Sequence, residues 1–552
     1  MTLSFHLNLK LRRRLGAFAA CLLAGMAGSG AVAQNAGISV EQAIALHLQG
    51  IDSGLIVNAA SRRVAGLQTF YNSRGYRPVW VVDGEPTEAA QRLRAVLADA
   101  AREGFDPDAY DAGEFSPRDA YSTARYEIAQ SAAALRYLND LRHGHAAPSE
   151  VDPDLFVEPR SLDGAIALEA LTAGADIGKT VEGYRPANLQ YHRLSISLAA
   201  LRAQAAAGVT WKPLPDSGKL APGSTGPAVT ALRARLRQDG ADLPDDAAAA
   251  TFDKTLADAV TAFQRRHGLT PDGIVGKATL AALNVGIEQR IRQIIVNMER
   301  WRWLPDDLGR RHIVVNIAGF SLDATTDGQV RQHMKVVVGR TYRRTPVFSV
   351  PMTYLEINPY WHVPPSIAVK DLLPKIRKSV DILAADGFRV FDGWGATAQE
   401  IDPHTIDWSS VRATRFSYKL RQDPGPKNAL GQIKFMMPNS HDVYLHDTPA
   451  RSLFDRTVRV FSSGCIRVER PRDLALFVLD GQSEWTPEAL ADAFDAPQTR
   501  RIVLRQPVPV HITYQTAWIG DDGILQFRDD IYERDAALGA VLFPVRHATA
   551  GH

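Results

Sequence analysis

The spacing of apolar residues changes along the chain, and this change constrains the fold more than any other feature. Over residues 40–206, apolar residues recur at intervals of three and four, a pattern that predicts helices. From residue 312 onward, β-branched runs take over and predict strands. The predicted helices cover residues 42–67, 87–101, 129–141 and 186–206. The 552 residues suffice for three or four domains of about 150 residues each, so we expect a multidomain α+β protein.

The β part is expected to hold several strands and one long insertion. The strand candidates are His312–Phe320, Val330–Val338, Pro346–Ile357, Ile433–Met436, Val443–His446 and Thr457–Phe461. Asp327-Gly328, a hairpin signal, lies between the first two. A polar, partly helical stretch over about 365–425 is long enough to act as a lid over a site. Shorter strand signals follow at 508–513 and 523–527, and no role is assigned to the C-terminal tail, 506–552.

A small module with an internal sequence repeat is predicted between the helical part and the β part. Residues 207–227 are rich in Gly, Pro, Ser and Lys and are typical of a linker. The run Ala-Val-Thr-Ala-Leu at 228–232 returns as Ala-Val-Thr-Ala-Phe at 259–263, and each run opens a helical pattern. With the turn Pro-Asp-Gly-Ile-Val-Gly at 271–276, residues 220–286 resemble the three-helix peptidoglycan-binding module. The alternative is another small helical bundle with a repeated core.

Residues 1–33 have the pattern of an export signal. A basic start precedes an apolar run, which ends in small residues up to Ala31-Val32-Ala33, an A-x-A cleavage site. Cleavage there would leave a mature chain that begins at Gln34, and the protein is expected in the periplasm. An uncleaved signal would instead leave it associated with the inner membrane.

Composition and charge exclude several classes of protein. The chain is 45% hydrophobic and 22% charged, as in soluble globular proteins. Its formal net charge is +2, and four of the cations lie in residues 1–33, so nothing favours nucleic acid as a partner. The sequence contains no zinc-type set of Cys and His and no phosphate-binding glycine loop. We therefore expect no metal and no cofactor, and we interpret His143-Gly144-His145 as structural.

One cysteine, Cys465, remains after removal of the signal, and it cannot form an intramolecular disulfide. A lone thiol in an oxidising compartment is a liability unless it is buried or used. A cysteine nucleophile needs a lowered pKa or a neighbouring base, and His446, at the end of a predicted strand, is the natural candidate. The N–H groups at Gly464-Cys465 suit an oxyanion hole. The alternatives are a small buried cysteine and a structural histidine.

The spacing of these residues resembles a known catalytic signature. His446, 15 intervening residues and then Ser462-Ser463-Gly464-Cys465-Ile466-Arg467 resemble the L,D-transpeptidase (YkuD-type) catalytic domain. Ser463 stands where many members of that family have His. The segments 298–305 (MERWRWLP) and 361–365 (WHVPP) resemble the long, scaffold-bearing branch of the family.

The resemblance implies a domain layout and a fold for each part. The expected domains are a helical scaffold (40–215), the peptidoglycan-binding module (220–286) and a mostly-β catalytic domain (311–505). The capping insertion at 365–425 belongs to the catalytic domain and is expected to be partly helical.

The resemblance also implies a role for each site residue. Cys465 is the nucleophile and His446 the general acid and base. Tyr444 and Gly464 lie near the oxyanion, and the carbonyl of Asp447 orients the histidine, while a role for the Asp447 side chain is left open. The residues expected to contact the substrate are Arg467, Ser463 and Trp361. The alternative for Arg467 is a structural ion pair, and the alternative for Trp361 is a place in the core.

The implied function is the formation of 3→3 cross-links between peptidoglycan stem peptides, with loss of D-Ala. The implied partners are peptidoglycan stems and glycan, cell-wall synthesis proteins, and carbapenems as inhibitors. An L,D-carboxypeptidase would share every residue named, and a non-catalytic wall-binding scaffold is the alternative from another class. Sortase-like enzymes space His and Cys more widely than the 18 residues here, and papain-like peptidases place Cys before His.

Overall fold

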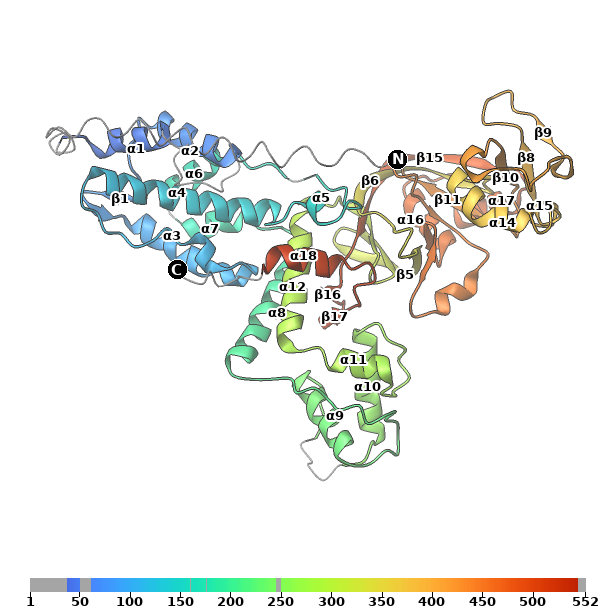
Figure 1. The fold of residues 1–552 in the computed structure, drawn as a ribbon, viewed down its shortest axis with the longest axis horizontal. Coiled ribbons are helices and arrows are strands. Elements are labelled where there is room, and N and C mark those ends of the chain that lie inside the picture. Colours follow the sequence, from blue (N-terminus) through green and yellow to red (C-terminus); the bar gives the residue numbers. More distant parts are fainter. Residues whose placement is uncertain (1–36, 50–60, 159, 175, 245–249, 545–552) are drawn as a thin grey trace. The chain divides into compact units, whose positions relative to one another are not determined.

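The computed structural model describes residues 37–49, 61–158, 160–174, 176–244 and 250–544 (Figure 1). The expected export signal lies outside these residues. Within them, no helix is both long and apolar enough to cross a membrane. The chain divides into two units, which are described separately. The first comprises residues 1–97, 110–136 and 163–178, and the second comprises 98–109, 137–162 and 179–552.

The first unit is helical, as the periodicity predicts. Its helices are α1 (Val40–Gln49), α2 (Ser61–Ser73), α3 (Glu88–Ala98), most of α4 (Ala120–His143) and α6 (Gly164–Ala173), with a small hairpin of β1 (Val81–Val82) and β2 (Glu85–Pro86). The carboxylate of Glu127 on α4 accepts hydrogen bonds from the backbone N–H groups of Val79 and Trp80 and from the Tyr71 hydroxyl. This buried network fixes the hairpin to the helices.

The second unit contains further helices. They are α5 (Pro148–Val151), α7 (Ile177–Glu182), α8 (Leu189–Ala206), α12 (Ile287–Arg302) and α18 (Arg534–Leu542), with the 3₁₀ turns η1 (Ala100–Glu103) and η2 (Pro107–Tyr110). The α12 helix carries most of the motif at 298–305, and its residues from Ile294 to Arg302 are all buried. The motif is therefore a packing element of this unit.

The predicted module at 220–286 forms three helices around its own core. They are α9 (Pro227–Gln238), α10 (Lys254–Arg266) and α11 (Lys277–Leu283). The repeated runs at 228–232 and 259–263 place Val229 and Leu232 of α9, and Val260 and Phe263 of α10, in this core. The side chain of Asp253 caps α10 by accepting a hydrogen bond from the Leu256 amide. The three-helix prediction is confirmed.

A nine-stranded sheet forms the centre of the β part, with the order β13-β5-β14-β12-β11-β6-β15-β3-β4. Its strands are β3 (Arg311–Asn316), β4 (Ser321–Thr326), β5 (Gln329–Gly339), β6 (Phe348–Ile357), β11 (Ile433–Met436), β12 (Leu445–His446), β13 (Val460–Ser462), β14 (Ile466–Val468) and β15 (Arg500–Thr513). The helices α16 (Pro471–Leu479) and α17 (Pro487–Asp495) contribute apolar residues to its core. The central β12 and β14 are parallel neighbours, so the strands that hold His446 and follow Cys465 lie side by side.

Two features of this sheet correct the predicted boundaries. The hairpin turn at Asp327-Gly328, where both residues have positive φ (52° and 73°), joins β4 to β5, and β4 itself was not predicted. The expected end of the catalytic domain at 505 falls within β15, which continues to Thr513 and pairs with both β6 and β3. Residues 506–513 are thus part of the central sheet. Beyond them, β16 (Ala517–Ile519) and β17 (Leu525–Phe527) form a hairpin.

The capping insertion has its own sheet and core. Its four strands, in the order β7-β10-β8-β9, are β7 (Trp361–His362), β8 (Phe388–Phe391), β9 (Glu400–Ile401) and β10 (Lys419–Gln422). Its helical part comprises α13 (Pro365–Ile367), the π-helical turn η3 (Ala368–Leu372), α14 (Leu373–Ile376) and α15 (Ile382–Ala385). Val363, Leu383, Trp408 and Leu420 are buried in its core. The insertion is partly helical, as predicted.

Candidate active site

The loop that carries Cys465 is held by hydrogen bonds on both sides of the thiol. Gly464 has φ +121°, a conformation that side chains rarely adopt, so glycine is required there. The Ser462 hydroxyl donates to the Cys465 carbonyl oxygen at 2.5 Å, and the Thr345 hydroxyl donates to the Gly464 carbonyl oxygen at 2.8 Å. Cys465 itself is partly exposed, and its Sγ lies 3.6 Å from the carbonyl oxygen of Asp442.

His446 has a fixed orientation and a strongly shifted pKa. Its Nδ1 lies 2.5 Å from the carbonyl oxygen of Asp447, which can only accept, so Nδ1 carries the proton and Nε2 is left as the basic nitrogen. Burial lowers the pKa of His446 to about 3, and the cations Arg467 and Lys434 contribute to the shift. The imidazole is therefore neutral at physiological pH and able to accept a proton.

The environment of Cys465 keeps the thiol protonated at rest. Burial raises the pKa of the Cys465 thiol, although a hydrogen bond from Tyr444 and the nearby charge of Lys434 act in the opposite direction. A neutral thiol therefore faces the same cavity as a neutral imidazole. This arrangement favours proton transfer to His446 during attack rather than a resting thiolate–imidazolium pair.

Tyr444 lies two residues before the base and beside the thiol. Burial and the neighbouring Cys465 hold the pKa of Tyr444 well above its usual range, so the phenol stays protonated and can donate a hydrogen bond. The side chain of Trp361 also interacts with this phenol. Trp361 lines the cavity and packs against the core of the capping insertion.

Lys434 is a site residue that the sequence analysis missed. It lies on β11 directly opposite His446 in the strand register, and its Nζ stands 4.3 Å from the centre of the Tyr444 ring. Burial lowers the pKa of Lys434, while the charges of Glu356 and Asp442 favour its protonated form. A cation at this place favours the thiolate form of Cys465 and the neutral form of His446.

One of the two expected oxyanion donors is engaged elsewhere. The Gly464 N–H donates to the Ser462 hydroxyl at 3.1 Å, so Gly464 shapes the loop in this structure. In the described part of the chain, the Cys465 N–H has no protein acceptor. The Cys465 amide and the Tyr444 hydroxyl are thus two donors beside Cys465 Sγ.

Ser463 is tied to the capping insertion through one arginine. Arg343 donates to the Ser463 hydroxyl at 2.8 Å and forms two hydrogen bonds with the carboxylate of Asp371, at 2.5 and 3.0 Å. Asp371 lies in the π-helical turn η3 of the insertion. Ser463 therefore takes part in the contact between the nucleophile loop and the insertion.

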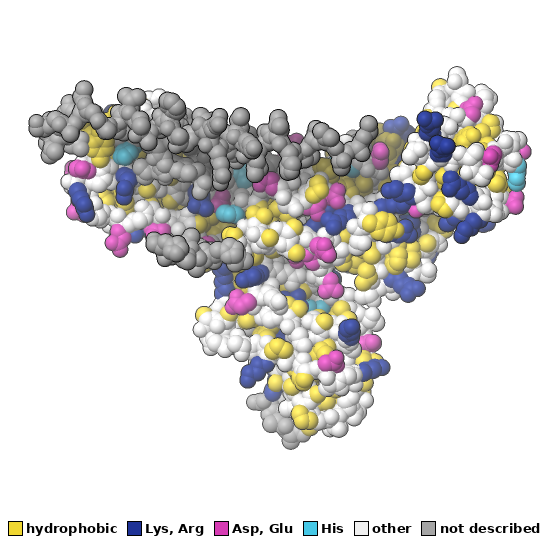
Figure 2. All heavy atoms as spheres, in the orientation of Figure 1, with side chains coloured by type: hydrophobic (Ala, Val, Ile, Leu, Met, Phe, Trp, Pro, Cys, Tyr) yellow, Lys and Arg dark blue, Asp and Glu magenta, His cyan; other side chains and the backbone are white. Residues whose placement is uncertain are grey.

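Cys465 and His446 open into a cavity of about 980 Å³ that is rich in cations. The charged residues that line it are Arg340, Arg343, Arg344, Lys370, Lys375, Arg467, Asp154, Asp371 and Asp442. Arg467 is one of these lining residues, and its buried Nε has no hydrogen-bond partner in the described structure. On the face drawn in Figure 2, Lys and Arg side chains also gather over the part that carries β8, β10 and α15. Such a cavity attracts a substrate that bears carboxylates.

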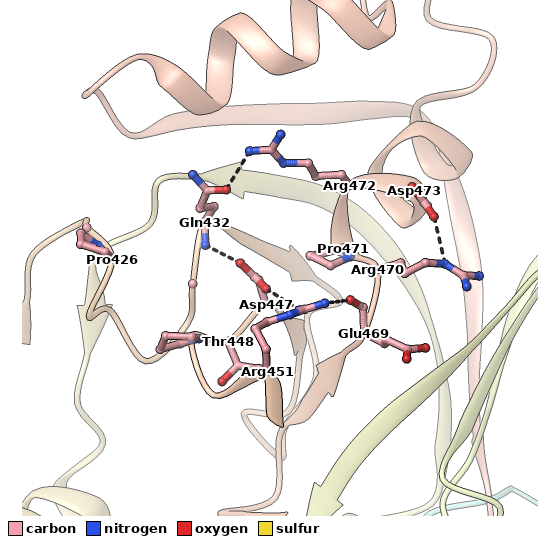
Figure 3. Close-up of a pocket in the computed structure, with 13 residues that line it drawn as sticks. Pro426, Gln432, Asp447, Thr448, Arg451, Glu469, Arg470, Pro471, Arg472 and Asp473 are labelled. Atoms are coloured by element: carbon pink, nitrogen blue, oxygen red, sulfur yellow. Dashed lines mark hydrogen bonds and ion pairs between the residues drawn. The ribbon is translucent and has the colours of Figure 1, made fainter. Parts of the chain in front are cut away.

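Asp447 lines a second cavity of about 460 Å³, which Cys465 does not line (Figure 3). Its carboxylate accepts a hydrogen bond from the Gln432 amide at 2.9 Å and lies 3.3 Å from Arg451. Gly431, with φ +60°, approaches so closely that a Cβ there would collide with this carboxylate. The backbone carbonyl of Asp447 orients His446, and its side chain holds that carbonyl in place.

We expect Gly431→Ala to disturb the catalytic histidine. The added Cβ must displace the Asp447 carboxylate, and a non-glycine residue at this φ costs about 1–2 kcal/mol. The rate at which Cys465 reacts with iodoacetamide should fall together with the melting temperature. Gly387→Ala is the matched control, since Gly387 has a similar φ (+72°) and open space around it. An equal effect of both variants on thiol reactivity would contradict a positioning role for Asp447.

The described residues contain no group of three or more His, Cys, Asp or Glu side chains that could hold a metal ion. In the pair at 143–145, His143 bonds to Asn139 and His145 to Asp140, so both have local partners.

Three family models match this chain. Residues 310–492 match the L,D-transpeptidase catalytic domain, residues 225–283 match a model described as "Putative peptidoglycan binding domain", and residues 65–198 match a scaffold domain. A Haemophilus influenzae protein described as "Putative L,D-transpeptidase" is 36% identical over 244 residues, which are 44% of this chain and 48% of that protein. The chain thus spans about half the length of the curated relative it matches.

Solved structures with some likeness include an L,D-transpeptidase from Mycobacterium smegmatis, at 13% identity and a TM-score of 0.17, covering 37% of this chain and 58% of that one. An L,D-transpeptidase in complex with imipenem has 14% identity and a TM-score of 0.18, covering 37% and 59%. From the family models and the curated relative, the chain carries a scaffold domain, a peptidoglycan-binding domain and an L,D-transpeptidase catalytic domain, the last of which contains Cys465 and His446.

Proposed function

We propose that this protein forms 3→3 cross-links between peptidoglycan stem peptides through a thioester on Cys465. The observation that carries the proposal is that Cys465 and His446 line one cavity. His446 is neutral, and its Nδ1 is fixed by the Asp447 carbonyl. A fixed base next to a thiol is the arrangement that nucleophilic acyl transfer needs.

The first half-reaction forms the acyl-enzyme. Cys465 Sγ attacks the carbonyl carbon between the third and fourth residues of a tetrapeptide stem, and His446 Nε2 takes the thiol proton. The Cys465 amide and the Tyr444 hydroxyl donate to the oxyanion, and one such donor contributes about 2.7–4 kcal/mol in a comparable site. His446 then returns the proton to the departing nitrogen, and D-Ala leaves.

The second half-reaction transfers the acyl group to an amine. The side-chain amine of diaminopimelate on a second stem attacks the thioester, and the carbon–sulfur bond breaks. The thiol is thereby regenerated. Arg467 is the residue that we assign to a substrate carboxylate, because it carries a positive charge and lines the cavity.

The proposed function also has consequences for location, wall binding, inhibitors and partners. The export pattern at 1–33 supports a periplasmic location, and the peptidoglycan-binding domain would raise the local concentration of substrate by holding the enzyme on the wall. Carbapenems are expected to acylate Cys465, and proteins of cell-wall synthesis are the expected partners.

The test uses mature protein and Cys465→Ala with a purified disaccharide-tetrapeptide, and products are identified by mass spectrometry. We expect a dimer with loss of one D-Ala from the wild type only. Tripeptide without dimer would indicate an L,D-carboxypeptidase instead. No product, together with no labelling of Cys465 by a carbapenem, would leave a non-catalytic wall-binding protein.

A further inference from the structure

A segment outside the matched catalytic domain forms one wall of the catalytic cavity. Residues 152–157 belong to the stretch matched by the scaffold model, yet Leu155 forms a parallel bridge with Val347 beside the start of β6. The Val347 amide donates to the Asp154 carbonyl at 2.9 Å, and the Phe156 amide donates to the Val347 carbonyl at 2.8 Å. Leu155 is 4% exposed and lies in the core of the central sheet.

This segment is firmly attached. The carboxylate of Asp152 accepts a hydrogen bond from Arg534 Nε at 2.9 Å, and both side chains are buried. Arg344 lies 3.3 Å from the same carboxylate. Asp152 thus joins the segment to α18 and to the loop before β6, so the residues that follow it have fixed positions.

The segment presents two side chains to the cavity. Because side chains alternate along an extended segment, Asp154 and Phe156 both face away from the buried Leu155, and both line the cavity. The ring of Phe156 stacks on His441 with 3.8 Å between ring centres. His441 directly precedes Asp442, whose carbonyl oxygen lies 3.6 Å from Cys465 Sγ. The aromatic pair therefore lies close to the nucleophile.

Asp154 differs from the other two carboxylates of the cavity. Asp371 is engaged by Arg343, and the charge of Asp442 acts on the nearby Lys434. Asp154 lies 3.7 Å from Arg534, whose shorter contact is with Asp152, and its side chain is 39% exposed. In a cavity with six Lys and Arg side chains, Asp154 is therefore the carboxylate best placed to attract a cation.

We propose that Asp154 and Phe156 form the binding site for the amine-bearing side chain of the acceptor. Asp154 binds the ammonium group, and Phe156 packs against the aliphatic chain that carries it. This inference rests on the proposed function. It adds that the acceptor side of the cavity is built by the scaffold segment rather than by the catalytic domain itself.

The bound ammonium loses one proton to water before it attacks. Its lone pair then forms the new carbon–nitrogen bond at the thioester carbonyl, and the electron pair of the broken carbon–sulfur bond returns to Cys465. The second proton passes from the amine to His446 and from there to the thiolate. Asp154 positions the amine and takes part in no covalent step.

The experiment measures how the acyl-enzyme partitions between dimer and tripeptide. Full mature protein and the variants Asp154→Asn and Phe156→Ala are incubated with disaccharide-tetrapeptide, and D-Ala, tripeptide and dimer are quantified over time. Asp492→Asn is the matched control, because Asp492 is exposed on α17 and does not line the cavity. Melting temperatures check that each variant is folded.

We expect Asp154→Asn to lower the ratio of dimer to tripeptide about tenfold, with acyl-enzyme formation within twofold of wild type. Phe156→Ala should lower the ratio in the same direction, and Asp492→Asn should leave it unchanged. An unchanged ratio in Asp154→Asn overturns the inference, and so does an equal loss of acyl-enzyme formation, which would place Asp154 on the donor side. Wild-type protein that makes tripeptide but no dimer overturns the proposed function, and the acceptor site with it.

Discussion

Replacing His446 with glutamine is expected to slow acylation of Cys465 by about 10²–10⁴-fold, the usual contribution of a positioned general base. Glutamine has a similar size but cannot take the thiol proton. The resting thiol is protonated, because burial raises the pKa of Cys465, so the loss of the base cannot be offset by an existing thiolate. The rate is measured by mass spectrometry with a stem peptide or a carbapenem as the acyl donor.

The pH dependence of the acylation rate distinguishes the loss of a base from a general disturbance of the fold. Since the pKa of His446 is about 3, the wild-type imidazole is neutral between pH 5 and 8, and the wild-type rate should be nearly constant there. The variant depends on the thiolate fraction, which rises tenfold per pH unit below the thiol pKa, so its rate should climb over the same range. His333→Gln, an exposed histidine on β5, is the control and should behave as wild type. A flat profile in His446→Gln would contradict the assignment of the base.

The sequence predicts elements well where one local pattern determines them. The predicted helix at 186–206 corresponds to α8, and the strand at 433–436 matches β11, because apolar spacing reports which face is buried. The Cys465–His446 pair could be found from spacing since the strand that holds His446 and the strand that follows Cys465 are neighbours.

Features that depend on distant pairing were missed. Only the end of strand β15, at 508–513, was predicted. Pro507 is typical of a break, yet a register shift between Val503 and Val508 accommodates it, and Pro509 pairs with Pro351 of β6. The strand β4 is half polar, and only its alternating buried residues, Leu322 and Ala324, mark it as a strand.

The missed site residues share one physical reason. Lys434 is on the polar side of a strand, which normally faces water, and only the register opposite His446 brings it to the site. Asp154 is almost 300 residues before His446 in the chain and reaches the cavity through a bridge to Val347. Neither position has a local signal that separates it from an ordinary surface charge.

The motif on α12 leads to the second large expected effect. Arg302 forms a buried ion pair with Glu299 at 2.7 Å, donates to the Glu103 carbonyl and to the Tyr191 hydroxyl, and stacks over Phe105. Glu299 in turn accepts a hydrogen bond from the Ala146 amide at 2.8 Å. One ion pair thus joins α12 to three segments of the second unit that precede it in sequence.

We expect Arg302→Met to lower the free energy of unfolding of the second unit by about 3–5 kcal/mol, because it leaves the Glu299 carboxylate buried without its partner. Urea denaturation followed by tryptophan fluorescence measures the change. The same substitution in the exposed pair of Arg310 and Asp327 should cost no more than about 1 kcal/mol. The double variant Glu299→Leu/Arg302→Met should be less destabilised than Arg302→Met alone, since it removes the unpaired charge. If the double variant instead loses as much stability as Arg302→Met and Glu299→Leu added together, the unpaired charge of Glu299 is not the cause. The lost contact of the Arg302 guanidinium with the Phe105 ring would then account for the loss.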